Sequence, residues 1–369
     1  MPSGFPHVLA PADLTARRHA HVAAFLASRS LDAEWLSDLM RERVGEGLLM
    51  LTSSPVHGLA NPTSDLDFIR IQEAEIDGPR ISTKIFENGH HLEVVSFSRA
   101  ELASNLDELH RLAGLPAEET VAGFRAWDKQ REPRRKQTER IVNGITLDGS
   151  APYLDWLPPL SRVWSRASVQ TAVEQAVHCV LAEAAGETRG RVGYAYNVLL
   201  HLMDALLSHH GDVYTTRKWY ALRWTRLVAE GGWHDDRLQA VASDVERLRK
   251  GVGAALRPAA AGEPLAGAFA ALALNAVRAT GTAETVTVRA ELTGSIQPFL
   301  AGSALLMSSG NGVVLPGVGA ERDLPLTGPA VGLDELAGLD AKSAASLLRA
   351  LRAGAAALRV GYPVTEAGR

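Results

Sequence analysis

Hydrophobic and polar residues alternate with a helical period over residues 12–44, and short apolar runs follow this segment. We predict two helices here, with the second capped by Asp32 at its N-terminus. One face of that second helix carries the apolar residues Trp35, Leu36, Leu39, Met40 and Val44. Gly45 and Gly47 are predicted to end the helix and to open the first strand, because glycine readily takes the backbone conformation that ends a helix.

The apolar runs after residue 47 predict strands at 48–54, 65–71 and 91–97. A further run at 81–86 precedes Asn88-Gly89, a dipeptide typical of a two-residue hairpin. The segment between the first two strands, 55–63, is rich in Pro, Gly and Asn and predicts a helical turn and a loop. These runs together predict a small mixed sheet with packed helices that ends near residue 100.

The remaining chain divides into a helical part and a short mixed part. Residues 100–275 are almost wholly helical in pattern, with an Ala, Pro and Gly-rich linker at 257–268. Beyond them, 285–292 alternates as a strand, 303–318 is typical of a turn-rich β segment, and 341–358 predicts a helix. We therefore predict an α+β fold with domains at 1–100, 101–275 and 276–369.

Composition is typical of a soluble globular protein with two or three domains: 369 residues, 46% apolar and 22% charged. The net charge of -4 and the pI near 6.3 argue against a protein that binds nucleic acid through its phosphates. The single cysteine, Cys179, excludes an internal disulfide framework and is expected to be a buried, inert thiol. No apolar run approaches the roughly 20 residues that span a bilayer, and no secretory signal is visible, so we expect a cytoplasmic protein without membrane contact.

Three acidic residues on the predicted strands indicate chemistry. Asp65 and Asp67 point to the same side of their strand, about 7 Å apart, because side chains alternate along a strand. Glu93 adds a third carboxylate if its strand lies beside theirs. Carboxylates in this arrangement are suited to divalent cations, so Asp65, Asp67 and Glu93 are predicted to bind magnesium. For His90 and His91, at the hairpin, a surface or turn role is favoured over zinc ligation.

The order of these features resembles the DNA polymerase β-like nucleotidyltransferase superfamily: helix, strand ending in two small residues, Asp-x-Asp strand, further acidic strand. The resemblance implies that two magnesium ions are held by the three acidic residues. It also implies that the end of the first strand, at Ser53 and Ser54, holds the triphosphate through backbone amides, and that Ser64, directly before the Asp-x-Asp residues, is a further candidate nucleotide contact. Ser53 stands where the superfamily usually has glycine. Glycine permits a closer backbone approach and positive φ, while serine adds a hydroxyl donor.

The helical part contains a second similarity. The segment 209–219 resembles the part of small-molecule nucleotidyltransferases that places a lysine toward the triphosphate, which implies a phosphate contact for Lys218 or, as the neighbouring alternative, Arg217. A helix start with a lysine along the apolar surface and a core Trp219 explains the same pattern. Asp204, His201 and Tyr194 are candidate acceptor-binding residues, because polar side chains in an apolar helix often line a cavity.

The arrangement of a small catalytic domain followed by a helical domain resembles antibiotic-modifying enzymes such as aminoglycoside and lincosamide nucleotidyltransferases. The resemblance covers residues 30–100 and, more loosely, residues 170–230. It implies a magnesium-dependent enzyme that transfers a nucleoside monophosphate from an NTP to a small molecule, in resistance or specialised metabolism, and releases pyrophosphate. One alternative is nucleotidylation of a protein, of toxin–antitoxin or regulatory type. Another is a degenerate protein that binds nucleotides without catalysis, which Ser53 in place of glycine keeps open.

Overall fold

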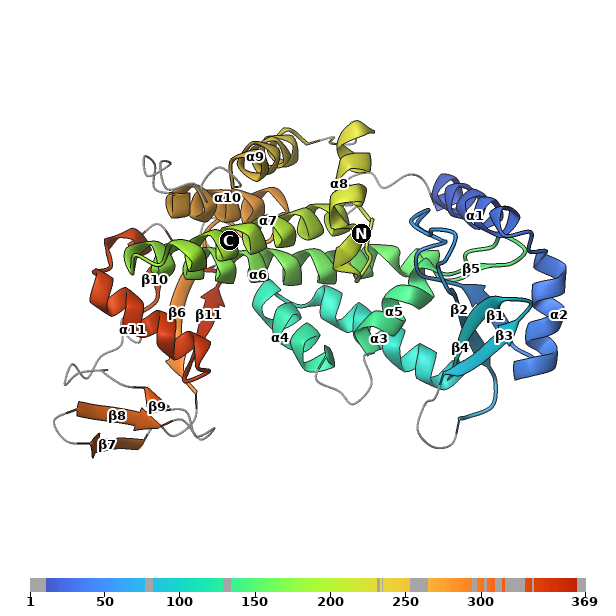
Figure 1. Ribbon diagram of the computed structural model, residues 1–369, viewed down its shortest axis with the longest axis horizontal. Helices are drawn as coiled ribbons and strands as arrows, with labels where there is room; N and C mark the ends of the chain where they lie inside the picture. The colour runs from blue at the N-terminus through green and yellow to red at the C-terminus, as the bar shows by residue number, and fades with distance from the viewer. Residues whose placement is uncertain are drawn as a thin grey trace. The chain divides into compact units, whose positions relative to one another are not determined.

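A computed structural model describes residues 11–76, 82–128, 134–230, 233, 235–252, 265–293, 297–301, 304–308, 314–315, 329–333 and 335–363. The fold is mixed α+β, as the sequence predicts, and it forms two compact units (Figure 1). The first unit comprises Met1–Trp164 and Leu207–Glu230, and the second comprises Ser165–Leu206 and Gly231–Arg369. The predicted boundaries at residues 100 and 275 stay predictions.

The first unit is built on a mixed five-stranded sheet in the order β3-β4-β2-β1-β5. Only β2 and β4 are a parallel pair; the other neighbours in this sheet run antiparallel. Its strands are β1 (Leu48–Leu51), β2 (Leu66–Gln72), β3 (Thr83–Glu87), β4 (His90–Ser98) and β5 (Ile145–Thr146). Its helices are α1 (Pro11–Ser28), α2 (Ala33–Val44), α3 (Arg99–Gly114), α4 (Ala117–Asp128), α5 (Arg134–Asn143), η1 (Leu154–Trp156), η2 (Arg217–Trp219) and α8 (Tyr220–Ala229).

Local sequence signals set the first half of this unit. The Asp32 side chain accepts hydrogen bonds from the backbone N–H groups of Glu34 and Trp35, which confirms the predicted N-cap of α2. Asn88 and Gly89 have φ of 50° and 79° and join Glu87 to His90 across a two-residue turn. Positive φ at both central positions is the requirement of a type I′ hairpin, so the predicted hairpin is confirmed.

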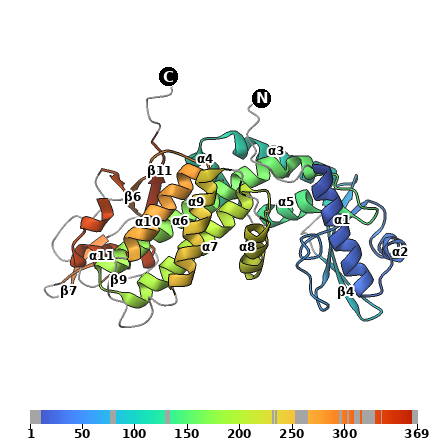
Figure 2. The same cartoon turned by 90° about the horizontal axis from the view of Figure 1, so that it is seen from above.

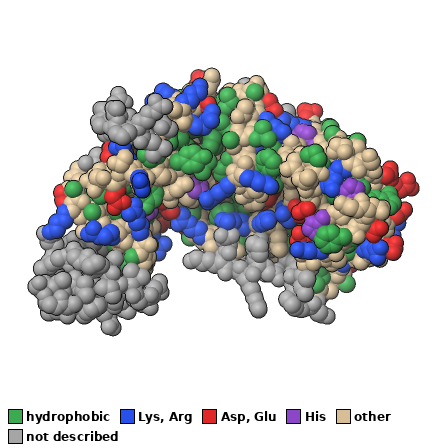
Figure 3. Space-filling view, viewed as in Figure 1, with side chains coloured by type: hydrophobic (Ala, Val, Ile, Leu, Met, Phe, Trp, Pro, Cys, Tyr) green, Lys and Arg blue, Asp and Glu red, His purple; other side chains and the backbone are tan. Residues whose placement is uncertain are grey.

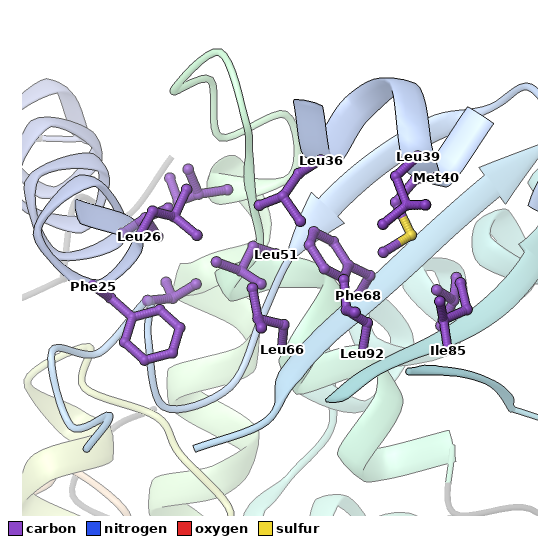
Figure 4. Packing of buried hydrophobic residues seen from close by; sticks show 14 residues of the cluster. Phe25, Leu26, Leu36, Leu39, Met40, Leu51, Leu66, Phe68, Ile85 and Leu92 are labelled. Carbon is purple, nitrogen blue, oxygen red and sulfur yellow. The ribbon is translucent and has the colours of Figure 1, made fainter. Parts of the chain in front are cut away.

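One face of the sheet is covered by α1 and α2, and the residues between them form the core of the unit (Figure 4). The strands contribute the alternate positions Leu51, Leu66, Phe68, Leu92 and Val94, and the helices contribute Phe25, Leu26, Leu36, Leu39 and Met40. Burial of each large apolar side chain contributes about 1.5–3 kcal/mol. The opposite face carries Ile69, Ile71 and Phe97 and is contacted by α3. The central strands β1, β2 and β4 therefore have buried residues on both faces, whereas the edge strand β3 is largely exposed.

The second unit combines long helices with two small sheets. The helices α6 (Leu157–Ala184) and α7 (Thr188–His209) run from one unit into the other, and α9 (Asp236–Val252) and α10 (Leu265–Ala279) lie side by side in both views (Figures 1 and 2). One sheet has the order β10-β6-β11 and the other β7-β8-β9. The remaining elements are β6 (Thr287–Leu292), β7 (Gln297–Ala301), β8 (Ala304–Ser308), β9 (Val314–Leu315), β10 (Val331–Gly332), η4 (Glu335–Gly338), α11 (Ala341–Arg352) and β11 (Ala356–Gly361).

Several predicted boundaries are wrong. The predicted helix at 341–358 ends at Arg352, and 356–358 belong to β11 instead, because Gly354 turns the chain with φ of 68° and the strand pairs with β6. The strand predicted at 48–54 ends at Leu51, and β5 interrupts the region predicted to be helical by pairing with β1. The predicted linker at 257–268 lies largely outside the described residues, and α10 already begins at Leu265.

Candidate functional site

Two of the three predicted acidic residues lie side by side near the start of the parallel pairing between β2 and β4. Asp67 on β2 is in direct register with Glu93 on β4, and both are partly buried. Leu66, Phe68, Leu92 and Val94 point into the core, so Asp67 and Glu93 point to the opposite face. The hairpin reverses the chain between β3 and β4, and β4 then pairs with β2 in parallel and carries Glu93 to this position. Asp67 and Glu93 therefore form a pair of carboxylates that the backbone register holds side by side.

Nitrogen-bearing side chains contact two of the three acidic residues. Arg140 on α5 donates from Nη2 to the Oδ2 of Asp67 at 3.3 Å, and both side chains are about one-fifth exposed. Asp65, directly before β2, lies 3.0 Å from the Nδ1 of His91, measured from its Oδ1. Across the residues described, no group of three His, Cys, Asp or Glu side chains is arranged to hold a metal ion. Carboxylate oxygens are ligands that magnesium prefers, but Arg140 and His91 would have to move before Asp65, Asp67 and Glu93 could bind the same ion.

A second basic residue on α5 lies close to the same carboxylates. The pKa of Lys136 is lowered, first by the positive charge of Arg140 and then by partial desolvation. The negative charges of Asp67 and Glu93 act in the opposite direction on this pKa. Lys136 ends the basic run 131–136, whose first three residues lie outside the described part of the chain. One face of α5 thus presents two cationic groups to the acidic pair.

Ser53 occupies the left-handed backbone region, with φ of 65°. Glycine takes this conformation at no steric cost, whereas it is unfavourable for residues with a Cβ. Ser53 is 4% exposed, and within the described chain its Oγ has no hydrogen-bond partner. The chain here keeps a backbone conformation suited to glycine although serine occupies the position. Next to it, the carbonyl of Ser54 accepts from the N–H of Leu59 at 2.9 Å and closes the following turn.

Arg29 fixes the start of the acidic strand. It donates from Nη1 to the backbone oxygen of Ser64 and contacts the Nδ1 of His90 at 2.9 Å through Nη2. The hydroxyl of Ser64 exchanges hydrogen bonds with Asn61 within the loop, which is a structural role; the predicted nucleotide contact of Ser64 stays a prediction. Ser64 directly precedes Asp65, and His90 directly precedes His91, so Arg29 links the two segments whose next residues form the Asp65–His91 contact.

The other predicted site residues have contacts of their own. Arg217 and Lys218 form η2 and are exposed, and the Lys218 Nζ lies 5.0 Å from the centre of the Trp219 ring. Their predicted phosphate contacts stay predictions. The candidates Asp204, His201 and Tyr194 belong to the second unit. Within that unit, buried Asp204 accepts from the Ser168 hydroxyl at 2.6 Å, and the Tyr194 hydroxyl accepts from Arg352 at 2.9 Å.

A buried polar cluster in the first unit lies beyond what the sequence analysis predicted. Asn143 at the end of α5 donates to Glu139 and to the backbone oxygen of Val213, each at 2.9 Å, and accepts from Arg18. The side chain of His57 is 7% exposed, and its Nε2 lies 3.8 Å from Glu139. No local sequence signal identifies this cluster, because its members come from four separate segments of the chain.

The His57 ring extends the cluster to Asp212. The His57 Nδ1 lies 3.5 Å from the Asp212 Oδ1, and Arg223 donates from Nε to the other carboxylate oxygen at 3.0 Å. Burial opposes ionisation of Asp212, but the charge of Arg223 and the contact with His57 outweigh it and hold the pKa of Asp212 well below its usual range. The ring of Tyr214 packs on His57 with centroids 4.6 Å apart. Asp212 therefore stays ionised at neutral pH.

Comparison with known proteins identifies a family but no activity. A family model described as a family of unknown function (DUF6001) matches residues 9–362, so the chain belongs to this family. A search of curated proteins finds no match.

In the part of the chain that is described, no helix is long and apolar enough to cross a membrane. Basic and acidic side chains are interspersed on the face shown in Figure 3.

Proposed function

We propose that this member of the family is a magnesium-dependent nucleotidyltransferase, which transfers a nucleoside monophosphate from an NTP to a small-molecule acceptor and releases pyrophosphate. The observation that carries the proposal is the direct register of Asp67 with Glu93 on adjacent parallel strands. The left-handed Ser53 at the end of β1 supports it, because such a turn lets backbone N–H groups approach a phosphate closely.

Asp67 and Glu93 would hold the metal, and Asp65, two residues before Asp67, would complete the carboxylate set. Bound magnesium would neutralise the charge that develops on the attacking and leaving oxygens. Arg140 contacts Asp67 and His91 contacts Asp65, so both contacts would open when the site is loaded. Once released, Arg140 and Lys136 are cations next to the reacting phosphates and would stabilise the departing pyrophosphate.

Lys218 or Arg217 would contribute a further cation to the triphosphate, since η2 belongs to the same unit as the sheet. For the acceptor, Asp204, His201 and Tyr194 remain the candidate contacts. The acceptor class that we propose is a small molecule of resistance or specialised metabolism.

The test is pyrophosphate release from ATP, CTP, GTP and UTP with magnesium, measured across a panel of small-molecule acceptors. Asp67→Asn and Glu93→Gln are expected to reduce the rate at least about a hundredfold, because each removes a charged metal ligand. Asp38→Asn is the matched control: Asp38 is exposed on α2 and, in the described structure, forms an ion pair with Arg41 one turn away. An active wild type whose rate is unchanged in both site variants would refute the assignment.

A second candidate function is nucleotide binding without catalysis. The pairing of Asp67 with Arg140 and of Asp65 with His91 favours it, because a relic site has no need to keep its carboxylates free. Calorimetry with each NTP and magnesium distinguishes the two functions: binding without pyrophosphate release under any condition supports the relic. A mass increase on co-incubated proteins, with none on metabolites, supports the protein-modifying alternative.

A further inference from the structure

A pocket in the first unit lies among α1, the turn at 55–58 and α8. It encloses about 740 Å³, including the space at its mouth. Its wall combines four arginines (Arg17, Arg18, Arg223, Arg226) with two carboxylates (Asp212, Glu230). With the histidines neutral, the wall therefore carries an excess of two positive charges. Asp67 and Glu93 are not part of this wall, so the pocket is separate from the acidic pair.

Two of the four arginines have carboxylate partners. Arg17 forms a two-point pair with Glu230, at 2.6 Å and 3.1 Å. Arg223 donates to Asp212 at 3.0 Å. Bidentate and charge-assisted hydrogen bonds of this kind use most of the hydrogen-bonding capacity of both the guanidinium and the carboxylate. These four residues give the pocket a rigid, electrically neutral frame.

The other two arginines donate to neutral oxygens. Arg226 donates to the backbone oxygens of His57 and Gly58, at 3.0 Å and 2.6 Å. Arg18 donates to the side-chain oxygen of Asn143. Behind Asn143, Glu139 raises the pKa of Arg18 through its charge, as Asp212 does. Even when Glu139 is added to the two carboxylates of the wall, one positive charge remains in excess.

Arg18 is the strongest indication of a ligand. It is 4% exposed, and its Nη1 is buried without a hydrogen-bond partner in the described structure. Burial lowers the pKa of Arg18 to about 10, so the guanidinium still carries its charge at neutral pH. A buried charged donor without an acceptor is costly, and proteins almost always supply a partner for it. An oxyanion in the pocket would supply that acceptor.

The rest of the wall indicates an organic anion and not a bare ion. Leu14, Val56 and Leu227 add apolar surface next to the arginines, and the volume exceeds that of an inorganic ion. Gly58 has φ of 61°, and a Cβ there would come within 2.9 Å of the His21 ring. This close approach holds the turn against α1, so the pocket is preformed on one side.

We infer that this pocket binds a small organic molecule through a phosphate or carboxylate group, which Arg18 and Arg226 recognise while the apolar wall contacts its carbon skeleton. The ligand would tie α1 and α8 to the turn that follows Ser53 and Ser54. This inference does not depend on nucleotidyl transfer.

The experiment is calorimetric titration of the whole protein at constant ionic strength with phenyl phosphate, benzoate and phenol. Saturable binding of at least one of the two anions is expected, without binding of phenol, and comparison of the anions distinguishes phosphate from carboxylate. Arg18→Met and Arg226→Gln are each expected to weaken binding at least about tenfold, because each removes a charged donor. Arg111→Met is the matched control, since Arg111 is an exposed arginine that pairs with Glu108 on its own helix.

A readout on the unmodified protein is hydrogen exchange with the bound anion. Peptides that cover 11–28, 55–60 and 220–230 are expected to gain protection, while peptides from α3 do not. No saturable binding of either anion would overturn the inference, and so would binding that Arg226→Gln leaves unchanged. If Arg18→Met does not fold, Arg226→Gln and the exchange pattern decide the question.

Discussion

Asn143→Ala is expected to destabilise the first unit strongly, because one amide joins three buried groups. Asn143 is 1% exposed and contacts Arg18 and Glu139, which are 4% and 1% exposed, as well as the oxygen of Val213. A hydrogen bond to a charged group contributes about 1.5–3 kcal/mol and one to a neutral group about 1 kcal/mol, which totals about 4–7 kcal/mol. Water that enters the space left by the amide would form some of the lost hydrogen bonds and so recover part of that free energy. We expect a loss of about 4 kcal/mol in the free energy of unfolding.

Urea denaturation followed by tryptophan fluorescence is the appropriate assay. Six of the seven tryptophans (Trp35, Trp127, Trp156, Trp164, Trp219, Trp224) lie in the first unit, so their emission reports on that unit. Asn197→Ala is the control: its half-buried amide donates to Gln175 in the second unit at 3.2 Å. It is expected to cost about 1 kcal/mol, which circular dichroism reports and the tryptophan transition reports only through Trp233. A loss below about 1.5 kcal/mol for Asn143→Ala, with an unchanged m value, would show that the cluster is not cooperative.

Three further predictions test the backbone and the buried thiol. Gly89→Ala is expected to destabilise the protein by about 1–2 kcal/mol, because the Gly89 φ of 79° is strained for alanine although nothing lies close enough for the added Cβ to touch. Gly193→Ala in α7 is the comparison and is expected to stabilise the protein by about 0.5–1 kcal/mol. Thermal melting of the two variants measures the difference. Ser53→Gly is expected to stabilise by about 1 kcal/mol, because relief of the left-handed strain and removal of an unpartnered hydroxyl outweigh the added chain entropy; a lower melting temperature would contradict this. Burial raises the pKa of Cys179 to about 12, so the folded state favours the neutral thiol. The free energy of unfolding is therefore expected to fall by about 1.4 kcal/mol per pH unit above pH 9, and Cys179→Ala is expected to lack that slope. In the native protein, Cys179 is expected to resist iodoacetamide until urea is added.

Local signals in the sequence were sufficient for the elements that surround the acidic pair. The Asp32 cap and the Asn88-Gly89 hairpin depend on neighbouring backbone groups, so their chemistry can be read from a few residues. The prediction that the strand of Glu93 lies beside the strand of Asp67 depended on that hairpin and is confirmed. The short strand β5 was missed because two residues carry no periodicity, and only pairing with β1 makes them a strand.

The environment of the acidic residues was beyond local patterns. Arg140 is 73 positions from Asp67 in the sequence, and no spacing rule indicates that α5 carries it to the sheet. The run of basic residues that ends at Lys136 is more typical of a solvated helix face, so it did not indicate this contact either. Arg18 looked like an ordinary helix residue. Its burial and its unpartnered Nη1 become visible only when α1 packs against the rest of the unit.

The sequence by itself determined the α+β class, the strands that carry Asp67 and Glu93, and the face that Asp67 shares with Ile69, because side-chain alternation and turn chemistry act over a few residues. The predicted strand at 65–71 begins one residue late, at Leu66, so Asp65 lies just before it. The tertiary structure decided which polar and charged groups meet: Arg140 with Asp67, His91 with Asp65, and an excess of arginine around one pocket. The physical reason is that electrostatic and packing energies depend on distance in space. Residues far apart in the chain acquire them only when the fold brings their side chains together.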